Sequence, residues 1–141
     1  MKYEEIKDLI PQRDPIIMVD KLIEVDGDVA VTGLTVRADN YFIDEDGLLA
    51  EPGLIEHIAQ SASAFAGYRA IRAGAATPPV GYIGAVKKFH CYCRPQPGDE
   101  LRTTITMGAE MAGVTIITGE TRVLDDIVAD TQMKIFIKPD D

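Results

Sequence analysis

Hydrophobic positions in the middle of the chain repeat with the period of a helix. At 100° per residue, Leu54, Ile58, Phe65 and Tyr68 fall on one side of a helix at Leu54–Ala73. Pro52 suits its first turn, and Gly74 suits its C-terminal end. Because no charged residue lies between Ile58 and Tyr68, we predict that this helix is covered nearly all round. The small residues on its second side would let another backbone approach closely.

The rest of the chain alternates mainly in the manner of strands. Turns of glycine, proline and aspartate separate stretches that are rich in β-branched residues. The pattern predicts a short helix at Tyr3–Ile10, a hairpin of Ile16–Val25 with Val29–Val36, a long acidic loop at Ala38–Glu51, and a four-strand meander of Val80–Cys93, Glu100–Glu110, Val114–Leu124 and Ile127–Lys138. We therefore expect one α+β domain over residues 1–141, in which the longest helix covers one face of an antiparallel sheet.

Charge and composition limit the classes of function. The chain has 141 residues and a net charge of −9, which disfavours binding to nucleic acid or to an anionic membrane surface. No apolar run reaches the roughly 18–20 residues of a membrane span, and the start carries acids where a signal peptide carries bases, so we expect a cytoplasmic protein. An acidic carrier protein would need a local cluster of bases, and the candidates are Arg69, Arg72, Lys87, Lys88 and Arg94.

Glu56 is the main chemical candidate, because it lies one turn into an otherwise apolar helix. A carboxylic acid in apolar surroundings holds its proton and can act as a general acid. The structural alternative is a buried glutamate held by Gln60 one turn further on, or by a helix N-terminus. His57 follows Glu56 but points about 100° away around the helix. Backbone N–H groups near Gly53 could hold a developing negative charge on a thioester carbonyl, as any helix start could.

No phosphate loop, dinucleotide fingerprint or metal-ligand cluster is present, so we expect neither a cofactor nor a metal. The serines of the helix, Ser61 and Ser63, lack the glycine elbow of a serine hydrolase.

Three segments, read in order, resemble the 3-hydroxyacyl-acyl-carrier-protein dehydratases of the hotdog superfamily. Leu9–Lys21 is similar to the family's Leu-Pro-His-Arg-x-Pro opening, which an apolar strand ending in Val-Asp-Arg follows. Glu51–Gln60 resembles its Pro-Gly segment and its Glu-x-x-Ala-Gln helix. The Gly84 region and Pro97–Asp99 resemble its glycine strand and its Pro-Gly-Asp turn.

The resemblance implies a six-stranded hotdog fold, a homodimer or larger even oligomer with joined sheets, and an acyl tunnel at the dimer interface. The substrate would be an acyl-carrier-protein or coenzyme A thioester. Glu56 would protonate the leaving hydroxyl group, and the strand at Gly84 would line the site, where a backbone N–H can polarise the thioester carbonyl. We expect further substrate contacts from Gln60 and Gly53 on the helix, and from Asn40 and Phe42 in the preceding loop.

One departure from the family pattern concerns the base. The family's catalytic histidine lies in the loop before the helix, whereas the matching loop here, residues 39–47, contains none. The sequence is nearer to a divergent branch associated with aryl-polyene-type pigment clusters, which is commonly labelled as dehydratase. Three possibilities remain open: His57 serves as the base across a dimer, a loop carboxylate serves, or no dehydration takes place.

Three functions therefore compete. A dehydratase would form an α,β-unsaturated thioester without freeing a thiol. A hotdog thioesterase, in which Glu56 activates water or attacks the carbonyl, would free a thiol. A non-catalytic acyl-binding or assembly partner would do neither, yet an acyl ligand would raise its melting temperature.

Overall fold

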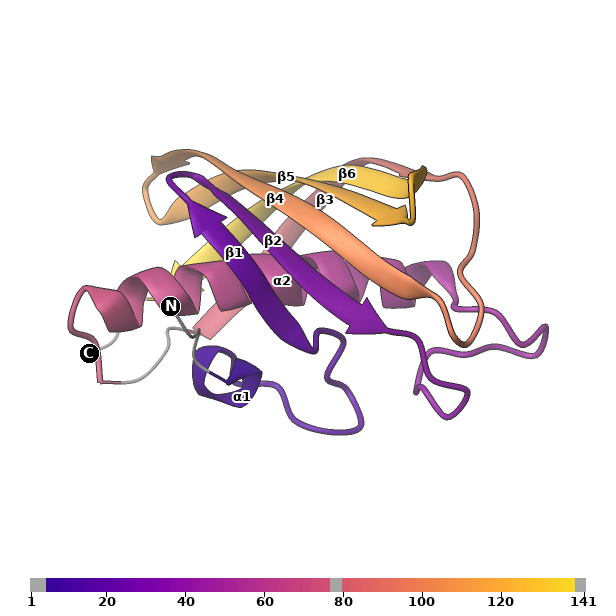
Figure 1. Cartoon of the computed structure of the whole chain (residues 1–141). Coiled ribbons are helices and arrows are strands. Elements are labelled where there is room, and N and C mark those ends of the chain that lie inside the picture. Colours follow the sequence, from indigo (N-terminus) through magenta and orange to yellow (C-terminus); the bar gives the residue numbers. More distant parts are fainter. Residues whose placement is uncertain (1–4, 77–79, 139–141) are drawn as a thin grey trace.

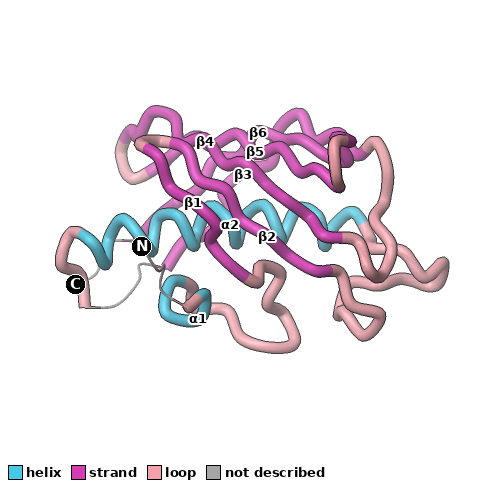
Figure 2. Tube along the Cα trace, in the orientation of Figure 1, coloured by secondary structure: helices cyan, strands magenta, loops and turns pink. Residues whose placement is uncertain are grey.

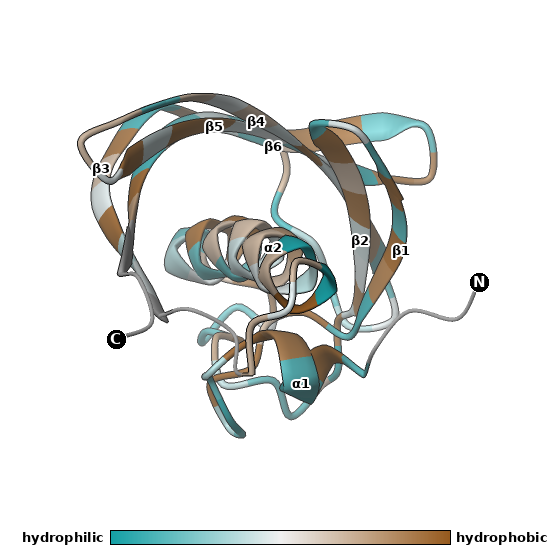
Figure 3. Ribbon diagram, turned by 90° about the vertical axis from the view of Figure 1, so that its left-hand side faces the viewer, coloured by the Kyte–Doolittle hydropathy of each residue, from teal (hydrophilic) through white to brown (hydrophobic). Residues whose placement is uncertain are grey.

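A single antiparallel sheet curves around one long helix in the computed structural model, which describes residues 5–76 and 80–138 (Figure 1). Six strands form this sheet in the order β1-β2-β4-β5-β6-β3. Figure 3 shows the sheet arched over the helix α2, while the short helix α1 packs on the opposite side of α2. The elements are α1 (Ile6–Leu9), β1 (Lys21–Asp26), β2 (Val29–Thr35), α2 (Glu51–Arg72), β3 (Val80–Cys91), β4 (Glu100–Met111), β5 (Val114–Val123) and β6 (Asp126–Lys138).

The predicted central helix is confirmed. None of residues 53–68 is exposed, and the charges of α2 lie toward its ends, at Glu51, Arg69 and Arg72, with the half-buried Glu56 between them. Pro52 lies in the first turn, and Gly74 follows the C-cap with a φ of 105°, a left-handed value that favours glycine. Each large apolar side chain that α2 buries stabilises the fold by roughly 1.5–3 kcal/mol.

Two glycines allow α2 to lie close to α1 on one side and to the sheet on the other. A β-carbon added at Gly67 would overlap the carbonyl oxygen of Leu9 at the end of α1. On the sheet side, a β-carbon at Gly119 of β5 would come within 2.5 Å of Ile58 Cγ2. The predicted close approach of another backbone to the small-residue side of the helix is thus confirmed at Gly67.

Two predicted features of the sheet are wrong. The segment 16–20 is not part of a strand. A side chain of α2 takes up backbone hydrogen bonds of Ile16 and Met18: Gln60 Oε1 accepts from Met18 N at 2.7 Å, and Gln60 Nε2 donates to the Ile16 carbonyl at 2.8 Å. The last four strands also do not pair in the order of the sequence, as the strands of a meander would. β4 pairs with β2, and β3 lies at the far edge beside β6 (Figure 2).

The remaining predictions for the fold agree with the structure in outline. The N-terminal helix is shorter than predicted, and Tyr3 and Glu4 lie outside the described residues. Residues 38–50 form a loop with one isolated bridge between Ile43 and Leu49. Among the described residues, no helix is both long and apolar enough to cross a membrane.

We predict that Gly67→Ala destabilises the protein by about 1–3 kcal/mol, although glycine to alanine in an ordinary helix gains roughly 1 kcal/mol. The added methyl group would force the Leu9 backbone away from α2. Urea unfolding measures the change in the free energy of unfolding. Gly81→Ala is the matched control, because its β-carbon would lie 3.6 Å from Ile135 Cγ2, an ordinary contact. Equal stabilities of Gly67→Ala and the parent would contradict this packing.

Candidate active site

Glu56 lies in the second turn of α2 and lines a cavity of about 230 Å³. Its side chain is half-buried and makes no hydrogen bond or ion pair with the described residues. The cavity lies between α2 and β3, and the loop that follows α1 adds Gln12 to its wall. The remaining lining residues are Ala59, Gln60 and Ser63 of α2, Gly81, Tyr82 and Ile83 of β3, and Ile135 of β6.

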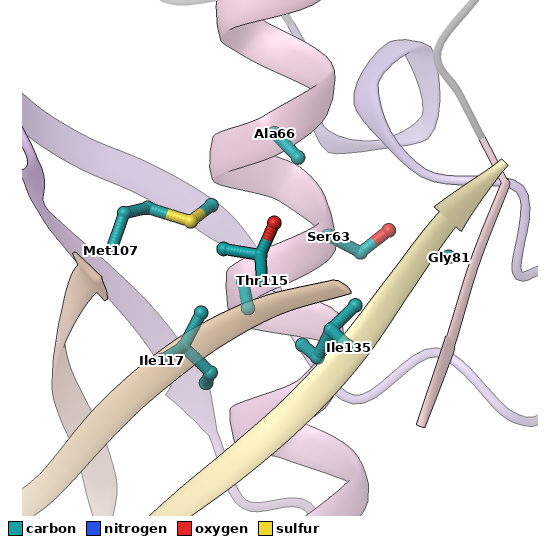
Figure 4. A pocket seen from close by; sticks show the side chains of 8 residues that line it. Ser63, Ala66, Gly81, Met107, Thr115, Ile117 and Ile135 are labelled. Carbon is teal, nitrogen blue, oxygen red and sulfur yellow. The ribbon is translucent and has the colours of Figure 1, made fainter. Parts of the chain in front are cut away.

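A second, narrow apolar pocket adjoins the cavity, and Ser63, Gly81 and Ile135 line both. Figure 4 shows the side chains of this pocket, which α2 and the strands contribute: Ala62, Ser63, Ala66, Gly81, Met107, Thr115, Ile117 and Ile135. Its volume is only about 10 Å³, enough for about one water molecule. An acyl chain could enter this pocket only if side chains such as Met107 move.

Gln60 lines the cavity, but both ends of its amide are occupied. They hold Ile16 and Met18, as described above, and Gln60 is 1% exposed. Gln60 therefore anchors the N-terminal segment to α2, and its hydrogen bonds do not go to Glu56. Glu56 and Gln60 lie in one cavity wall, and a substrate contact from Gln60 remains a prediction.

His57 lies on a different side of α2 and is fully buried. Its Nδ1 lies 2.6 Å from the Met18 carbonyl oxygen, and its Nε2 lies 2.7 Å from Thr103 Oγ1. A carbonyl can only accept, so Nδ1 carries the proton and donates it, while the Thr103 hydroxyl donates to Nε2. Thr121 Oγ1 lies 2.7 Å from Thr103 Oγ1 and is the next hydroxyl group in this series of hydrogen bonds. Both ring nitrogens are thus occupied, which does not support His57 as the base.

The other predicted contacts lie around the start of α2 and outside the cavity lining. The Gly53 N–H donates to the Ala50 carbonyl at 2.9 Å, so this amide is not free to hold a thioester oxygen. Phe42 packs directly on Gly53, since a β-carbon there would lie 2.7 Å from Phe42 Cβ. Asn40 Oδ1 accepts from Phe42 N at 2.8 Å, and Asn40 Nδ2 donates to Met18 Sδ at 3.3 Å.

The loop before α2 is also held from the β3–β4 connection. Arg94 donates to Asp44 and lies 3.4 Å from Asp46, and its side chain is 27% exposed. Desolvation raises the pKa of the Asp44 carboxyl, but Arg94 and the backbone N–H groups of Asp46 and Leu48 together outweigh it, so the pKa lies below its usual value. Arg94 therefore fastens this loop.

Gly84 lies in β3 at a register shift between Ile83 and Ala85. A β-carbon at Gly84 would overlap the ring of Phe136 on β6, so the glycine makes room for that ring. The cavity lining contains Gly81, Tyr82 and Ile83 of the same strand, whereas Gly84 is absent from it. A role for the Gly84 backbone toward a thioester remains a prediction.

Several lining residues escape sequence reasoning, among them Gln12, Ser63, Gly81 and Tyr82. Ser63 carries a usable signal, because it lies two helical turns from Glu56 on the same side of α2. Gln12 has no periodic pattern around it, and Gly81 and Tyr82 reach the cavity only because β3 pairs with β6.

The fold and the cavity define a hotdog protein of the dehydratase class. A family model described as ApeP-like, ApeP dehydratase, matches residues 4–141. The chain therefore belongs to the ApeP-like dehydratase family, and its class of enzyme is that of a lyase.

Curated relatives extend the likeness over nearly the whole chain. The 3-hydroxyacyl-(acyl-carrier-protein) dehydratase FabZ of Rickettsia bellii is 27% identical over 139 residues, which are 95% of this chain and 94% of the relative. The FabZ of Clostridium botulinum strain Kyoto is 29% identical over 143 residues, 97% of this chain and 95% of the relative.

Solved structures agree on the architecture. The dehydratase heterocomplex ApeI:P from Xenorhabdus doucetiae superposes with a TM-score of 0.90 at 17% identity, covering 98% of this chain and 93% of that one. The Escherichia coli PaaI protein superposes with a TM-score of 0.66 at 15% identity, covering 82% and 80%. At these identities the likeness concerns the fold alone.

We predict that the burial of His57 makes the protein less stable in mild acid. Burial lowers the pKa of His57 from 6.5 to about 4, although its bond to the Met18 carbonyl raises it. Above pH 6.5 the imidazole is neutral in both states, and the full stability is present. As the pH falls from 6.5 toward 4, the unfolded chain binds a proton that the folded chain does not, so stability is lost. The loss is roughly 2 kcal/mol at pH 5.

Urea unfolding at pH 7, 6 and 5 measures this loss. His57→Gln should show a smaller decline in the free energy of unfolding over the same range, whatever its stability at pH 7. His90→Gln, which removes the exposed imidazole of β3, is the control for the loss of a histidine. Parallel curves for His57→Gln and the parent would show that His57 is not the titrating group.

Proposed function

We propose that the protein dehydrates 3-hydroxyacyl thioesters of acyl carrier protein or coenzyme A to trans-2-enoyl thioesters, in fatty-acid or polyene-type biosynthesis. The observation that carries this proposal is the place of Glu56. Among the described residues, it supplies the only carboxyl or imidazole group of the cavity lining, and an apolar pocket adjoins this cavity. Membership of a dehydratase family and the curated names of the relatives favour this reaction over thioester hydrolysis and over a non-catalytic role.

Glu56 acts as the general acid in this reaction. A base removes a proton from C2, the electrons form the C2–C3 double bond, and the bond from C3 to the hydroxyl oxygen breaks. The Glu56 carboxylic acid gives its proton to the leaving hydroxyl group, which departs as water. The proton taken from C2 then returns Glu56 to its acid form by way of solvent. No water is consumed and no thiol is released.

The base comes from a second hotdog chain in this proposal. The lining offers no second carboxyl group and no imidazole within the described residues, and His57 is enclosed. Glu56 is half-buried at the side of the cavity that the edge strand β3 borders. β3 also exposes apolar side chains, Tyr82 at 57%, Ile83 at 42% and Val86 at 37%. A second chain that pairs along β3, in a homodimer or a heterocomplex like ApeI:P, would cover Glu56 and bring in the base.

The thioester carrier approaches beside β3 as well. Of the basic residues considered for an acidic carrier, Arg94 is held by Asp44 and Asp46, and Arg69 lies 3.6 Å from Asp28. Arg72 lies over the ring of Tyr68, 5.8 Å from its centre. Lys87 and Lys88 are exposed on β3, the strand that also lines the cavity. These two lysines are therefore the better candidates for contacts with an acidic carrier protein.

We expect Glu56→Gln to abolish dehydration, because the amide keeps the shape of the side chain and cannot donate the proton that the leaving group needs. Mass spectrometry of the products from a 3-hydroxyacyl thioester measures the enoyl thioester, and a thiol assay measures hydrolysis. Glu51→Gln, on the exposed first turn of the same helix, is the matched control. Full turnover in Glu56→Gln would refute the proposal, and a Glu56-dependent release of thiol would assign hydrolysis instead.

We expect Val86→Asp to lower both the molecular mass of the assembly and the rate of dehydration, because the added charge opposes pairing along β3. Light scattering after gel filtration measures the mass. Leu124→Asp is the control, since Leu124 is 91% exposed in the β5–β6 turn. A fully active monomer, or an unchanged mass in Val86→Asp, would contradict the second-chain proposal.

A further inference from the structure

The cavity that holds Glu56 and the narrow apolar pocket follow one another along α2. Among the residues of this helix, the cavity is lined by Glu56, Ala59, Gln60 and Ser63, and the pocket by Ala62, Ser63 and Ala66. Ser63 lies two turns beyond Glu56, or roughly 10 Å along the helix axis. An acyl chain that has its C3 at Glu56 and extends along α2 past Ser63 therefore meets the apolar pocket next.

The pocket is nearly closed, and most of its wall is stiff. Its volume is about 10 Å³, against about 230 Å³ for the cavity, so it has no room for an alkyl chain. The sheet contributes Thr115, Ile117 and Ile135, which are at most 6% exposed. These three side chains are β-branched and have little freedom about χ1, so they do not move aside for a ligand.

Met107 is the adaptable part of the wall. Its side chain is half-buried against the apolar core, and an unbranched thioether with three rotatable bonds changes its shape readily. Figure 4 shows Met107 on one side of the pocket, across from Ser63 and Gly81, which also line the cavity. The backbone of Met107 is fixed, because its N–H donates to the Asp28 carbonyl at 2.8 Å and it pairs with Ile117 of β5. The side chain alone therefore decides whether the pocket is closed.

We propose that Met107 closes the inner end of the acyl site and sets the length of the acyl chain that the protein accepts; this inference rests on the proposed dehydration. Short acyl groups fill the cavity beside Glu56 and end at Ser63. Longer groups have to push the thioether out of the pocket, and they lose affinity because Met107 then gives up its contacts with the core. Met107 touches the far end of the chain and none of the reacting atoms, so it determines specificity and takes no part in the chemistry.

The test measures the binding of saturated acyl coenzyme A thioesters of increasing length by calorimetry, in the assembly that the protein forms. Met107→Ala removes most of the side chain and opens the pocket. We expect the tightest-binding acyl chain to lengthen by about two carbons, and this longer chain to bind about tenfold more tightly than it binds to the parent. The shortest chains should bind as they do to the parent. Met111→Ala is the matched control, because Met111 lies on the same strand and is 77% exposed.

A second substitution refills the pocket from the helix. Ala66 lines the pocket, and leucine is favourable in a helix, so Ala66→Leu added to Met107→Ala should restore the length preference of the parent. If Met107→Ala does not fold, Met107→Val removes less volume, suits a strand and should give a smaller lengthening. An unchanged length preference on opening the pocket would overturn the proposal. So would a lengthening that Ala66→Leu does not reverse, an equal weakening of all lengths, or no binding of any length.

The two proposals fail separately. If the parent protein makes no enoyl product but Met107→Ala lengthens the preferred ligand, dehydration is wrong and the role of Met107 in binding stands. If the parent is active and kcat/KM depends on chain length in the same way in Met107→Ala, dehydration stands and the role of Met107 is refuted.

Discussion

The polar side chains of α2 must find hydrogen bonds inside the core, and much of the structure follows from this need. His57, Gln60 and Ser61 are at most 1% exposed, and each has a partner outside the helix. Gln60 and His57 hold Ile16 and Met18, while Ser61 lies 2.7 Å from Thr32 of β2. A buried polar group without a partner costs about 1–3 kcal/mol, so these bonds specify how the N-terminal segment wraps the helix.

The cavity arises where this packing leaves room. Glycines at two points draw α2 close to α1 and to the middle of the sheet, and the helix turns a strip of small residues, Ala59, Ser63 and Ala66, toward β3. Glu56 stands at one end of the strip. The N-terminal segment, held by Gln60, brings the Pro11–Arg13 loop to the same place. Glu56 and Gln12 thus line one cavity because the packing of the N-terminal segment on α2 brings them there.

Periodicity was sufficient to predict the central helix, most strand positions and the isolated acid Glu56. It failed at segment 16–20, because the groups that replace strand pairing there belong to a helix about forty residues later in the chain. It also failed for the neighbours of β3, since antiparallel strands of similar pattern do not reveal their partners. His57 looked available because Thr103 and the Met18 carbonyl become its partners only in the folded chain.

The place of β3 at the edge of the sheet affects how the protein is made. Among the described residues its only strand neighbour is β6, which follows the other five strands in the sequence. During translation β3 therefore leaves the ribosome long before the strand that can receive it, and the wall with Gly81 and Tyr82 closes only when β6 has emerged. Until then an apolar strand with free backbone groups is open to chaperones or to the same strand of another nascent chain.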